Sequence, residues 1–286
     1  MYLSRLRVEV GPDPAREYPA QKWLRNLYHV HQRLCMAFPS TGHRSEGVEG
    51  DPVHIRRGPD AGFLFRVDPG RDGRPVILVQ SVLQPQWECA FRNARHFLVD
   101  PGGHRDPWDV KVFDPHFVTS QHFRFRLVAN PTKKVGTIQR EERKSLTKEE
   151  LKQRKGRHGR RVPVPSAEEL SAWRGQNPQG DVREYISGKL EVWLKSRAEP
   201  GGFSVQSVTV QPGYSYFKKP HRLLDGATDD EPDGAEQGVL LRAVCFDGVL
   251  TVTDPVRFTD TLAHGIGPGK AFGFGLLSVA PSGTAL

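Results

Sequence analysis

A glycine-dense segment that carries one lysine lies close to the C-terminus, HGIGPGKAFGFGLLSVAP at residues 264–281. Glycine lacks a Cβ, so a backbone rich in it can approach a ligand closely, and phosphates are a frequent ligand of such loops. The segment differs from a nucleoside-triphosphate loop at two positions: His264 replaces the first glycine, and Ala271 replaces the Ser or Thr that would hold magnesium. It also leads into an apolar strand pattern instead of a helix. These differences favour the phosphate chain of a nucleic acid as the ligand.

The best catalytic candidates lie on a predicted helix in the first half of the chain. Tyr28 and His31 are three residues apart, so on a helix they are neighbours, on a stripe with Leu24 and Cys35 beside the apolar face. His29 points to nearly the opposite side, so a helix would prevent His29 and His31 from binding one metal ion. A histidine beside a buried face is also typical of a packed or surface histidine, and its position alone leaves both interpretations open.

Several other chemistries lack their motifs. The sequence contains no nucleophile elbow, no HExxH zinc helix, no calcium loop and no cysteine pair at zinc spacing. RNA supplies its own nucleophile, the ribose 2′-hydroxyl. Its cleavage therefore needs only a group that transfers protons, a cation near the phosphorus and a grip that aligns the reacting oxygens. A histidine, a tyrosine and lysines suffice, and we predict no metal and no cofactor.

Composition narrows the class of protein. The 286 residues suffice for two domains, and 41 basic against 33 acidic residues give a net charge of +8 and a pI near 9.5. This charge suits a polyanionic partner. Three widely spaced cysteines predict free thiols in a reducing cytoplasm, and no apolar stretch is long enough to span a membrane. We expect a cytoplasmic protein without a membrane partner.

The order of predicted elements repeats along the chain. In the first half, hydrophobic periodicity predicts elements at 2–10 (strand), 19–38 (helix, strongest over 23–38, with Asn26 as an alternative start to Pro19), 63–67 and 76–83 (strands) and 87–98 (weaker helix). In the second half it predicts elements at 123–129 (strand), 182–197 (helix), 203–210 and 239–252 (strands), 254–263 (helix) and a final strand. We predict an α+β fold of two tandem ferredoxin-like (RRM-like) domains, antiparallel sheets with helices on one face, at residues 1–118 and 119–286.

Two charged segments interrupt the second domain. A basic tract at residues 133–161, within a predicted insertion at 132–165, has too few apolar residues to form a core. It is either a solvated loop or an arm that becomes ordered on a nucleic-acid backbone. The segment at 225–236 is acidic and would repel phosphate, so we interpret it as a loop.

Short segments from one end of the chain to the other resemble the CasE family, the CRISPR-associated endoribonucleases of type I-E systems. The matching segments are MYLS at 1–4, LYHVHQ at 27–32, VQS at 79–81, RFRLVANP at 124–131, RRVP at 160–163, AVCFDGVL at 243–250 and the glycine loop. They occur in the family's order and span residues 1–281. Their order and spacing together, more than any one of them, carry the resemblance.

The resemblance implies a metal-independent endoribonuclease that binds the repeat stem-loop of precursor CRISPR RNA, cuts at its 3′ base by 2′-hydroxyl attack, and keeps the mature guide RNA as a Cascade subunit. It places the acid-base role on His31, with assistance from Tyr28, and a second-domain basic residue near the scissile phosphate at Lys218 or Lys219. The implied RNA-binding residues are Arg160, Arg161, Lys219, Arg222, Gly265, Gly267, Gly269, Lys270 and Phe272. Two other classes remain: a non-catalytic RNA-binding module with an idle His31, and a ribonucleoprotein scaffold that docks protein and RNA together.

Overall fold

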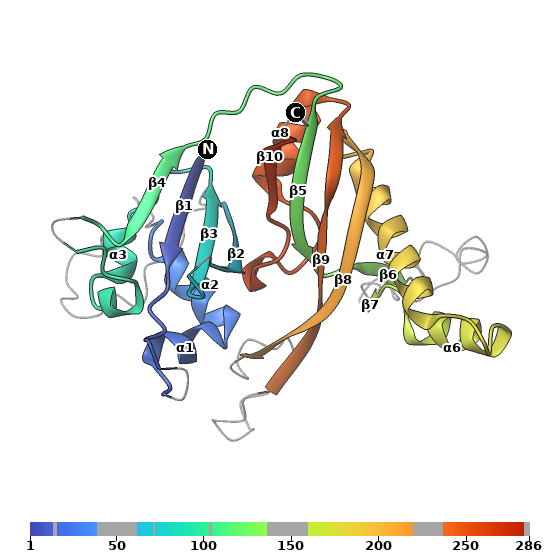
Figure 1. The fold of residues 1–286 in the computed structure, drawn as a ribbon, viewed down its shortest axis with the longest axis horizontal. Coiled ribbons are helices and arrows are strands. Elements are labelled where there is room, and N and C mark those ends of the chain that lie inside the picture. Colours follow the sequence, from blue (N-terminus) through green and yellow to red (C-terminus); the bar gives the residue numbers. More distant parts are fainter. Residues whose placement is uncertain are drawn as a thin grey trace, which may run out of the picture.

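The protein is built from two four-stranded antiparallel sheets, each covered on one face by helices (Figure 1). The structure is a computed structural model. It describes residues 1–13, 16–38, 62–70, 72–102, 105–135, 160–219 and 237–282. Both sheets follow the β-α-β-β-α-β order of the ferredoxin-like fold, so the predicted fold class is confirmed.

The first sheet has the strand order β2-β3-β1-β4. Its strands are β1 (Tyr2–Arg7), β2 (Phe63–Pro69), β3 (Pro75–Ser81) and β4 (Trp108–Val112). The alternation of side chains along a strand places Ser4 and Leu6 in the core under the helices, whereas Arg5 on the opposite face is exposed. The sequence analysis did not predict β4, a short edge strand whose side chains are mostly exposed.

The helices that cover this sheet are shorter than predicted. They are α1 (Pro19–Leu24), α2 (Leu27–Cys35), α3 (Trp87–Phe91) and the 3₁₀ turn η2 (Arg95–Phe97). One continuous helix up to residue 38 is thus wrong. A helix does begin at Pro19, but it ends at Leu24, and the alternative start at Asn26 is confirmed for α2. The Asn26 side chain accepts a hydrogen bond from the Tyr28 backbone N–H at 3.2 Å, which caps α2 and separates it from α1.

The second sheet repeats the topology of the first, with the order β10-β5-β9-β8. Its elements are β5 (His122–Ala129), α6 (Ala167–Gln176), α7 (Val182–Ala198), β8 (Phe203–Lys219), β9 (Gln237–Val252), α8 (Pro255–His264) and β10 (Leu277–Pro281). β8 continues nine residues beyond its predicted end at residue 210. The additional part pairs with β9, as a long hairpin that extends below the rest of the sheet in Figure 1.

The two ends of the predicted basic insertion pair with each other. β6 (Thr132–Val135) and β7 (Arg160–Pro163) form a separate two-stranded ribbon. The indole N–H of Trp193 on α7 donates to the Thr132 carbonyl at 3.1 Å, which fixes the ribbon to the second core. The middle of the insertion, 136–159, and the acidic segment 225–236 lie outside the described residues.

Buried polar contacts hold the two sheets together. The guanidinium of Arg66 on β2 is 4% exposed, pairs with Asp68 at 2.7 Å and donates to the carbonyls of Arg126 and Leu276 in the second half at 3.3 and 3.2 Å. The Gln80 amide donates to the Leu262 carbonyl. A buried charge with these partners fixes the relative position of the two halves.

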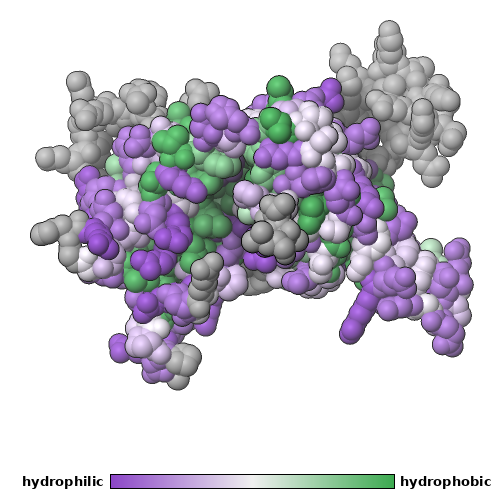
Figure 2. Space-filling view, turned by 45° about the horizontal axis from the view of Figure 1, so that its top comes forward, coloured by the Kyte–Doolittle hydropathy of each residue, from purple (hydrophilic) through white to green (hydrophobic). Residues whose placement is uncertain are grey.

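A cavity of about 420 Å³ lies where the two sheets face each other, with Leu3, Leu78 and Leu276 in its lining. Figure 2 shows hydrophobic side chains gathered in the hollow between the halves. We keep the division of the chain at residues 118 and 119 as a proposal; this point lies between β4 and β5.

Candidate active site between helix α2 and the glycine loop

Helix α2 holds His31 in a fixed orientation. The imidazole stacks against Phe63 and Phe65 of β2, with ring centroids 5.3 and 6.2 Å apart and interplanar angles of 30° and 20°. Its Nδ1 atom is buried, and its Nε2 atom lies 3.5 Å from the Cys35 sulfur one turn along the helix. Nε2 is therefore the ring nitrogen on the side of Cys35, and the two phenyl rings restrict how the imidazole can turn.

Tyr28 lies one turn before His31 and faces the second half of the chain. Its ring centroid is 6.1 Å from that of Phe272 in the glycine loop. Burial, followed by the nearby charge of Cys35, raises the pKa of the Tyr28 hydroxyl above its ordinary value. The phenol thus keeps its proton at neutral pH and can donate a hydrogen bond to an oxygen of a substrate.

The glycine loop is anchored at both ends. α8 ends at His264, and the Ile266 N–H then donates to the Gly275 carbonyl at 2.9 Å, while the Gly275 N–H donates to Val128 of β5 at 2.8 Å. The sequence suggested that the loop passes directly into a strand, and this is wrong. A 3₁₀ turn, η4 (Lys270–Phe272), intervenes, and β10 begins only at Leu277.

The glycines in this loop pack against protein atoms. A Cβ added to Gly265 would lie 2.7 Å from the Gly275 carbonyl oxygen and 2.8 Å from Leu64, and one on Gly269 would lie 2.9 Å from Phe274. Gly267 similarly faces the Trp193 ring at 3.3 Å. Close packing thus explains these glycines without a bound phosphate. Accessible side chains of the loop include the exposed Lys270 and the half-buried Phe272.

We predict that Gly265→Ala destabilises the protein more than a matched glycine substitution in open space. Gly265 has φ +72°, and Gly73 has φ +78° with no atom within 4 Å of an added Cβ. Gly73→Ala should therefore lower the free energy of unfolding by about 1–2 kcal/mol, the energy of holding alanine in the left-handed conformation. Gly265→Ala should lower it further, because the added methyl group also clashes with backbone. Urea unfolding of the two variants measures the difference. Equal losses of unfolding free energy would show that the loop relaxes around the new methyl group.

The structure brings the glycine loop and helix α2 into one site. Tyr28 meets Phe272, and a Cβ on Gly273 would lie 3.3 Å from the Phe65 ring that stacks under His31. η4 is a direct neighbour of both α2 and β2. The two regions that the sequence suggested for chemistry and for phosphate contact, more than 200 residues apart, are thus adjacent.

Basic residues approach this site from β8. Lys218 and Lys219 lie at the end of β8, paired in register with Gly238 and Gln237 of β9. α2 is in contact with β8, and in Figure 1 the far end of the β8–β9 hairpin bends toward the first half of the molecule. The backbone thus brings the predicted lysines toward α2. Arg222 lies outside the described residues.

The two-stranded ribbon supplies a second basic surface. Arg160 and Arg161 lie on β7, and Arg161 is exposed and donates to the Thr132 hydroxyl at 3.3 Å. Lys134, also exposed, is the register partner of Arg161 on β6. Arg161 and Lys134 therefore present two positive charges side by side. Among the described residues, no group of three histidine, cysteine or carboxylate side chains could hold a metal ion.

Sequence reasoning placed Cys35 on the stripe with His31 but gave it no role. The thiol lies in contact with Nε2, so a substrate hydroxyl that reaches Nε2 must share or replace this contact. Phe63 and Phe65 were predicted only as strand residues, because their contact with His31 depends on how β2 packs under α2. The i, i+4 spacing of His31 and Cys35 was the signal available for the thiol.

We predict that alkylation of Cys35 by N-ethylmaleimide blocks the site. The adduct would fill the space beside His31 Nε2. It should lower the rate of RNA cleavage by about tenfold or more, because it keeps the reacting groups from their aligned positions. Cys35→Ala should keep activity within a few-fold, because one weak hydrogen bond is lost, and should resist the reagent. Inactivation of the alanine variant to the same extent would assign the effect to Cys89 or Cys245, the other free thiols.

These features define a class of protein that has two ferredoxin-like halves joined by buried polar contacts. A helix of the first half carries a histidine and a tyrosine, and this helix lies beside a glycine loop of the second half. The chain belongs to the CRISPR associated protein family, whose model matches residues 1–281. None of the helices in the described parts of the chain is long and apolar enough to cross a membrane.

The similarity to individual relatives extends over nearly the whole chain. It is 30% identical to the CRISPR-associated endoribonuclease Cse3 of Thermus thermophilus and 26% identical to the Cascade subunit CasE of Escherichia coli, over 98% of this chain and 100% of each relative. A solved structure of Cse3 bound to a 19-nucleotide RNA has a TM-score of 0.60 at 27% identity, covering 98% of this chain and 100% of that one. Another, of Thermus thermophilus Cse3 with an RNA representing a pre-cleavage complex, has a TM-score of 0.57 at 26% identity and covers 98% of both chains.

Proposed function

We propose that this protein is an endoribonuclease that binds the repeat stem-loop of precursor CRISPR RNA, cuts at the 3′ base of the stem, and retains the mature guide as a Cascade subunit. The observation that carries the proposal is the junction of Tyr28 and His31 on α2 with the glycine loop. The full-length similarity to RNA-bound endoribonuclease structures supports it. A transcript as substrate also places the protein in the cytoplasm.

His31 is the proton-transfer group of the proposed reaction. The ribose 2′-oxygen attacks phosphorus as its proton passes to a base, the bond from phosphorus to the 5′-oxygen breaks, and the 5′-oxygen takes up a proton. The products are a 2′,3′-cyclic phosphate and a 5′-hydroxyl, and no metal ion enters the balance. His31 acts as base or acid through Nε2, because Nδ1 is buried.

The other groups stabilise charge on the phosphate. The Tyr28 phenol, which is protonated at neutral pH, donates a hydrogen bond to a non-bridging oxygen. Lys218, or its neighbour Lys219, supplies positive charge from the β8–β9 hairpin. These are the groups that metal-independent cleavage requires in addition to the acid-base residue.

The stem-loop is held mainly through its shape and phosphates. The deep, narrow major groove of A-form RNA hides base edges, so a protein reads the stem through its backbone. We assign these backbone contacts to Arg160, Arg161 and Lys134 on the ribbon and to Lys270 on η4. Arg222 is a further candidate from the sequence.

Incubation of the purified protein with its own repeat transcript in excess EDTA tests the proposal. We expect one cut at the 3′ base of the stem, a 3′ end that resists phosphatase until the cyclic phosphate is opened, and a product that stays bound. Intact RNA bound with high affinity would support the scaffold alternative instead. Cleavage only after magnesium is added would overturn the metal-independent mechanism.

A further inference from the structure

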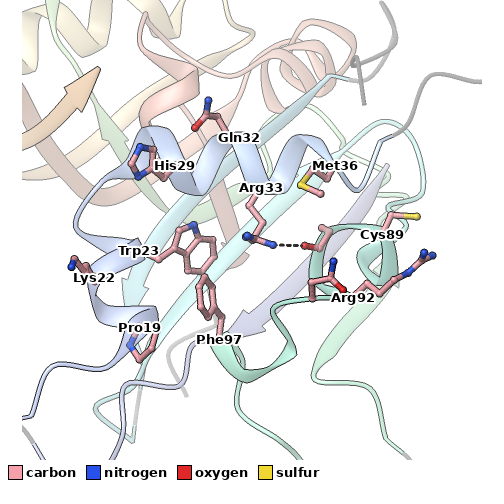
Figure 3. A pocket seen from close by; sticks show the side chains of 12 residues that line it. Pro19, Lys22, Trp23, His29, Gln32, Arg33, Met36, Cys89, Arg92 and Phe97 are labelled. Carbon is pink, nitrogen blue, oxygen red and sulfur yellow. Dashed lines mark hydrogen bonds between the residues drawn. The ribbon is translucent and has the colours of Figure 1, made fainter. Parts of the chain in front are cut away.

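A second cavity lies on the outer side of helix α2, away from His31. Its volume is about 830 Å³, within the range of about 300–1,000 Å³ typical of small-molecule sites. α1, α2, α3 and η2 surround it (Figure 3). Trp23, Met36 and Phe97 supply apolar surface, and Lys22, Arg33 and Arg92 supply positive charge.

Within the described parts of the chain, the cations that line this cavity have no acidic partner there. Its lining, as far as the structure describes it, contains three Lys or Arg residues and no Asp or Glu. The Arg33 guanidinium donates to the Ala90 carbonyl at 2.9 Å and lies 5.4 Å from the Phe97 ring centroid, and burial lowers the pKa of Arg33. A positive charge held away from water beside exposed cations is stabilised by a bound anion.

Two aromatic rings lie beside these cations. The Trp23 and Phe97 rings lie 5.3 Å apart between centroids, tilted by 35°. The Trp23 side chain is nearly fully buried, and its Nε1–H has no acceptor among the described residues. Trp23 therefore supports the Phe97 ring from the core, and Phe97, which is half-buried, is the ring that can meet a ligand. An accessible aromatic ring beside positive charge is a combination that binds single-stranded nucleic acid, in which a base stacks on the ring and phosphates meet the cations.

Helix α2 separates this cavity from the candidate active site. His29, Gln32, Arg33 and Met36 recur at the spacing of one helical face and line the cavity, whereas Tyr28, His31 and Cys35 lie on the other side. The distance across a helix with its side chains is about 10–12 Å. A strand of a few nucleotides can therefore pass from the scissile phosphate over α2 into the cavity.

We propose that this cavity binds the single-stranded nucleotides on the 3′ side of the scissile phosphate. The proposal rests on the proposed function, because it assumes that the cut occurs beside His31. The bound segment is the one that leaves with the 5′-hydroxyl, so the cavity adds affinity for uncut precursor and none for the retained guide. A guide RNA ending at the cut would not reach it.

The test compares two repeat RNAs, one ending a single nucleotide after the cut and one extended by eight further nucleotides. Each carries a 2′-deoxy sugar just upstream of the cut when affinity is measured. We expect the extension to improve the affinity of the wild-type protein about tenfold, the effect of one stacked base. The variant Lys22→Glu/Arg92→Glu, which changes two exposed side chains of the lining, should lose this gain. Arg174→Glu/Arg183→Glu, an equal charge change on exposed residues of α6 and α7, should keep it.

The outcomes separate this proposal from the proposed function. Cleavage of the short ribose RNA by the Lys22→Glu/Arg92→Glu variant at the wild-type rate, with the extension effect lost, supports both. Failure of every protein to cut the short RNA contradicts the proposed function, while the affinity comparison still tests the cavity. An equal extension effect in the wild type and in the Lys22→Glu/Arg92→Glu variant overturns the cavity as an RNA site. Loss of Cascade assembly by that variant, without any extension effect in the wild type, assigns the cavity to a protein partner instead and overturns the proposal.

Discussion

Replacing His31 with alanine is expected to slow cleavage of repeat RNA by about 10² to 10⁴, the usual contribution of a general acid-base residue, while RNA binding stays nearly unchanged. The imidazole packs against Phe63 and Phe65 under α2 and makes a polar contact through Nε2. It therefore contributes to proton transfer far more than to the basic surface that holds the stem. Single-turnover cleavage with enzyme in excess isolates the chemical step from product release.

His29→Ala is the matched control for this experiment. His29 lies on the same helix, two residues away, but is exposed on the other side. The His29→Ala variant should cut the short RNA, which lacks the 3′ extension, at the wild-type rate. Thermal unfolding of both variants shows whether the space left beside the phenyl rings destabilises the fold. Equal rates for the two variants, both near wild type, would remove His31 from the mechanism.

Affinity for the repeat stem-loop is expected to fall by about 10³ to 10⁵ between about 50 and 200 mM salt, as for proteins that contact about 6–10 phosphates. The chain carries eight more basic than acidic residues, and its exposed ribbon pairs Lys134 with Arg161. Binding through phosphates releases counterions from the RNA, so the logarithm of the affinity falls linearly with that of the salt concentration.

Fluorescence anisotropy across a salt series measures this slope. The variant Lys134→Gln/Arg161→Gln should weaken binding to all stem sequences alike and reduce the slope by about two, one for each lost phosphate contact. An unchanged slope in this variant would exclude the ribbon from the RNA interface. A shallow slope in the wild type would contradict recognition through phosphates altogether.

The fold could be predicted from the sequence because its elements have local signals. Period-two patterns identified most of the sheet strands, and the order of strands and helices indicated two ferredoxin-like halves. Asn26 marked the start of α2, because an asparagine before an apolar helix is a capping signal. β4, β6 and β7 were missed because they are only 5, 4 and 4 residues long, and they exist as strands through pairing with distant partners.

The parts of the candidate site could also be predicted, but their arrangement could not. The helical spacing predicted that Tyr28, His31 and Cys35 share one stripe, and the spacing of the glycines identified the loop. Contact between Tyr28 and Phe272 depends on how the two halves dock, and docking is determined by Arg66 and Gln80, which carry no sequence signal of an interface. Glycine density was interpreted as room for phosphate, whereas in the fold that room is filled by Leu64, Trp193 and Phe274.

A single 2′-deoxy substitution in the repeat RNA, at the nucleotide just upstream of the cut, tests the central claim most directly. The mechanism has no nucleophile other than this hydroxyl, because His31 moves protons and Tyr28 donates a hydrogen bond. In EDTA, the substituted RNA should bind as tightly as the unmodified RNA and remain uncut, while the unmodified RNA is cleaved. Cleavage of the substituted RNA at the same position would show that water or a protein group attacks phosphorus, and would contradict the account.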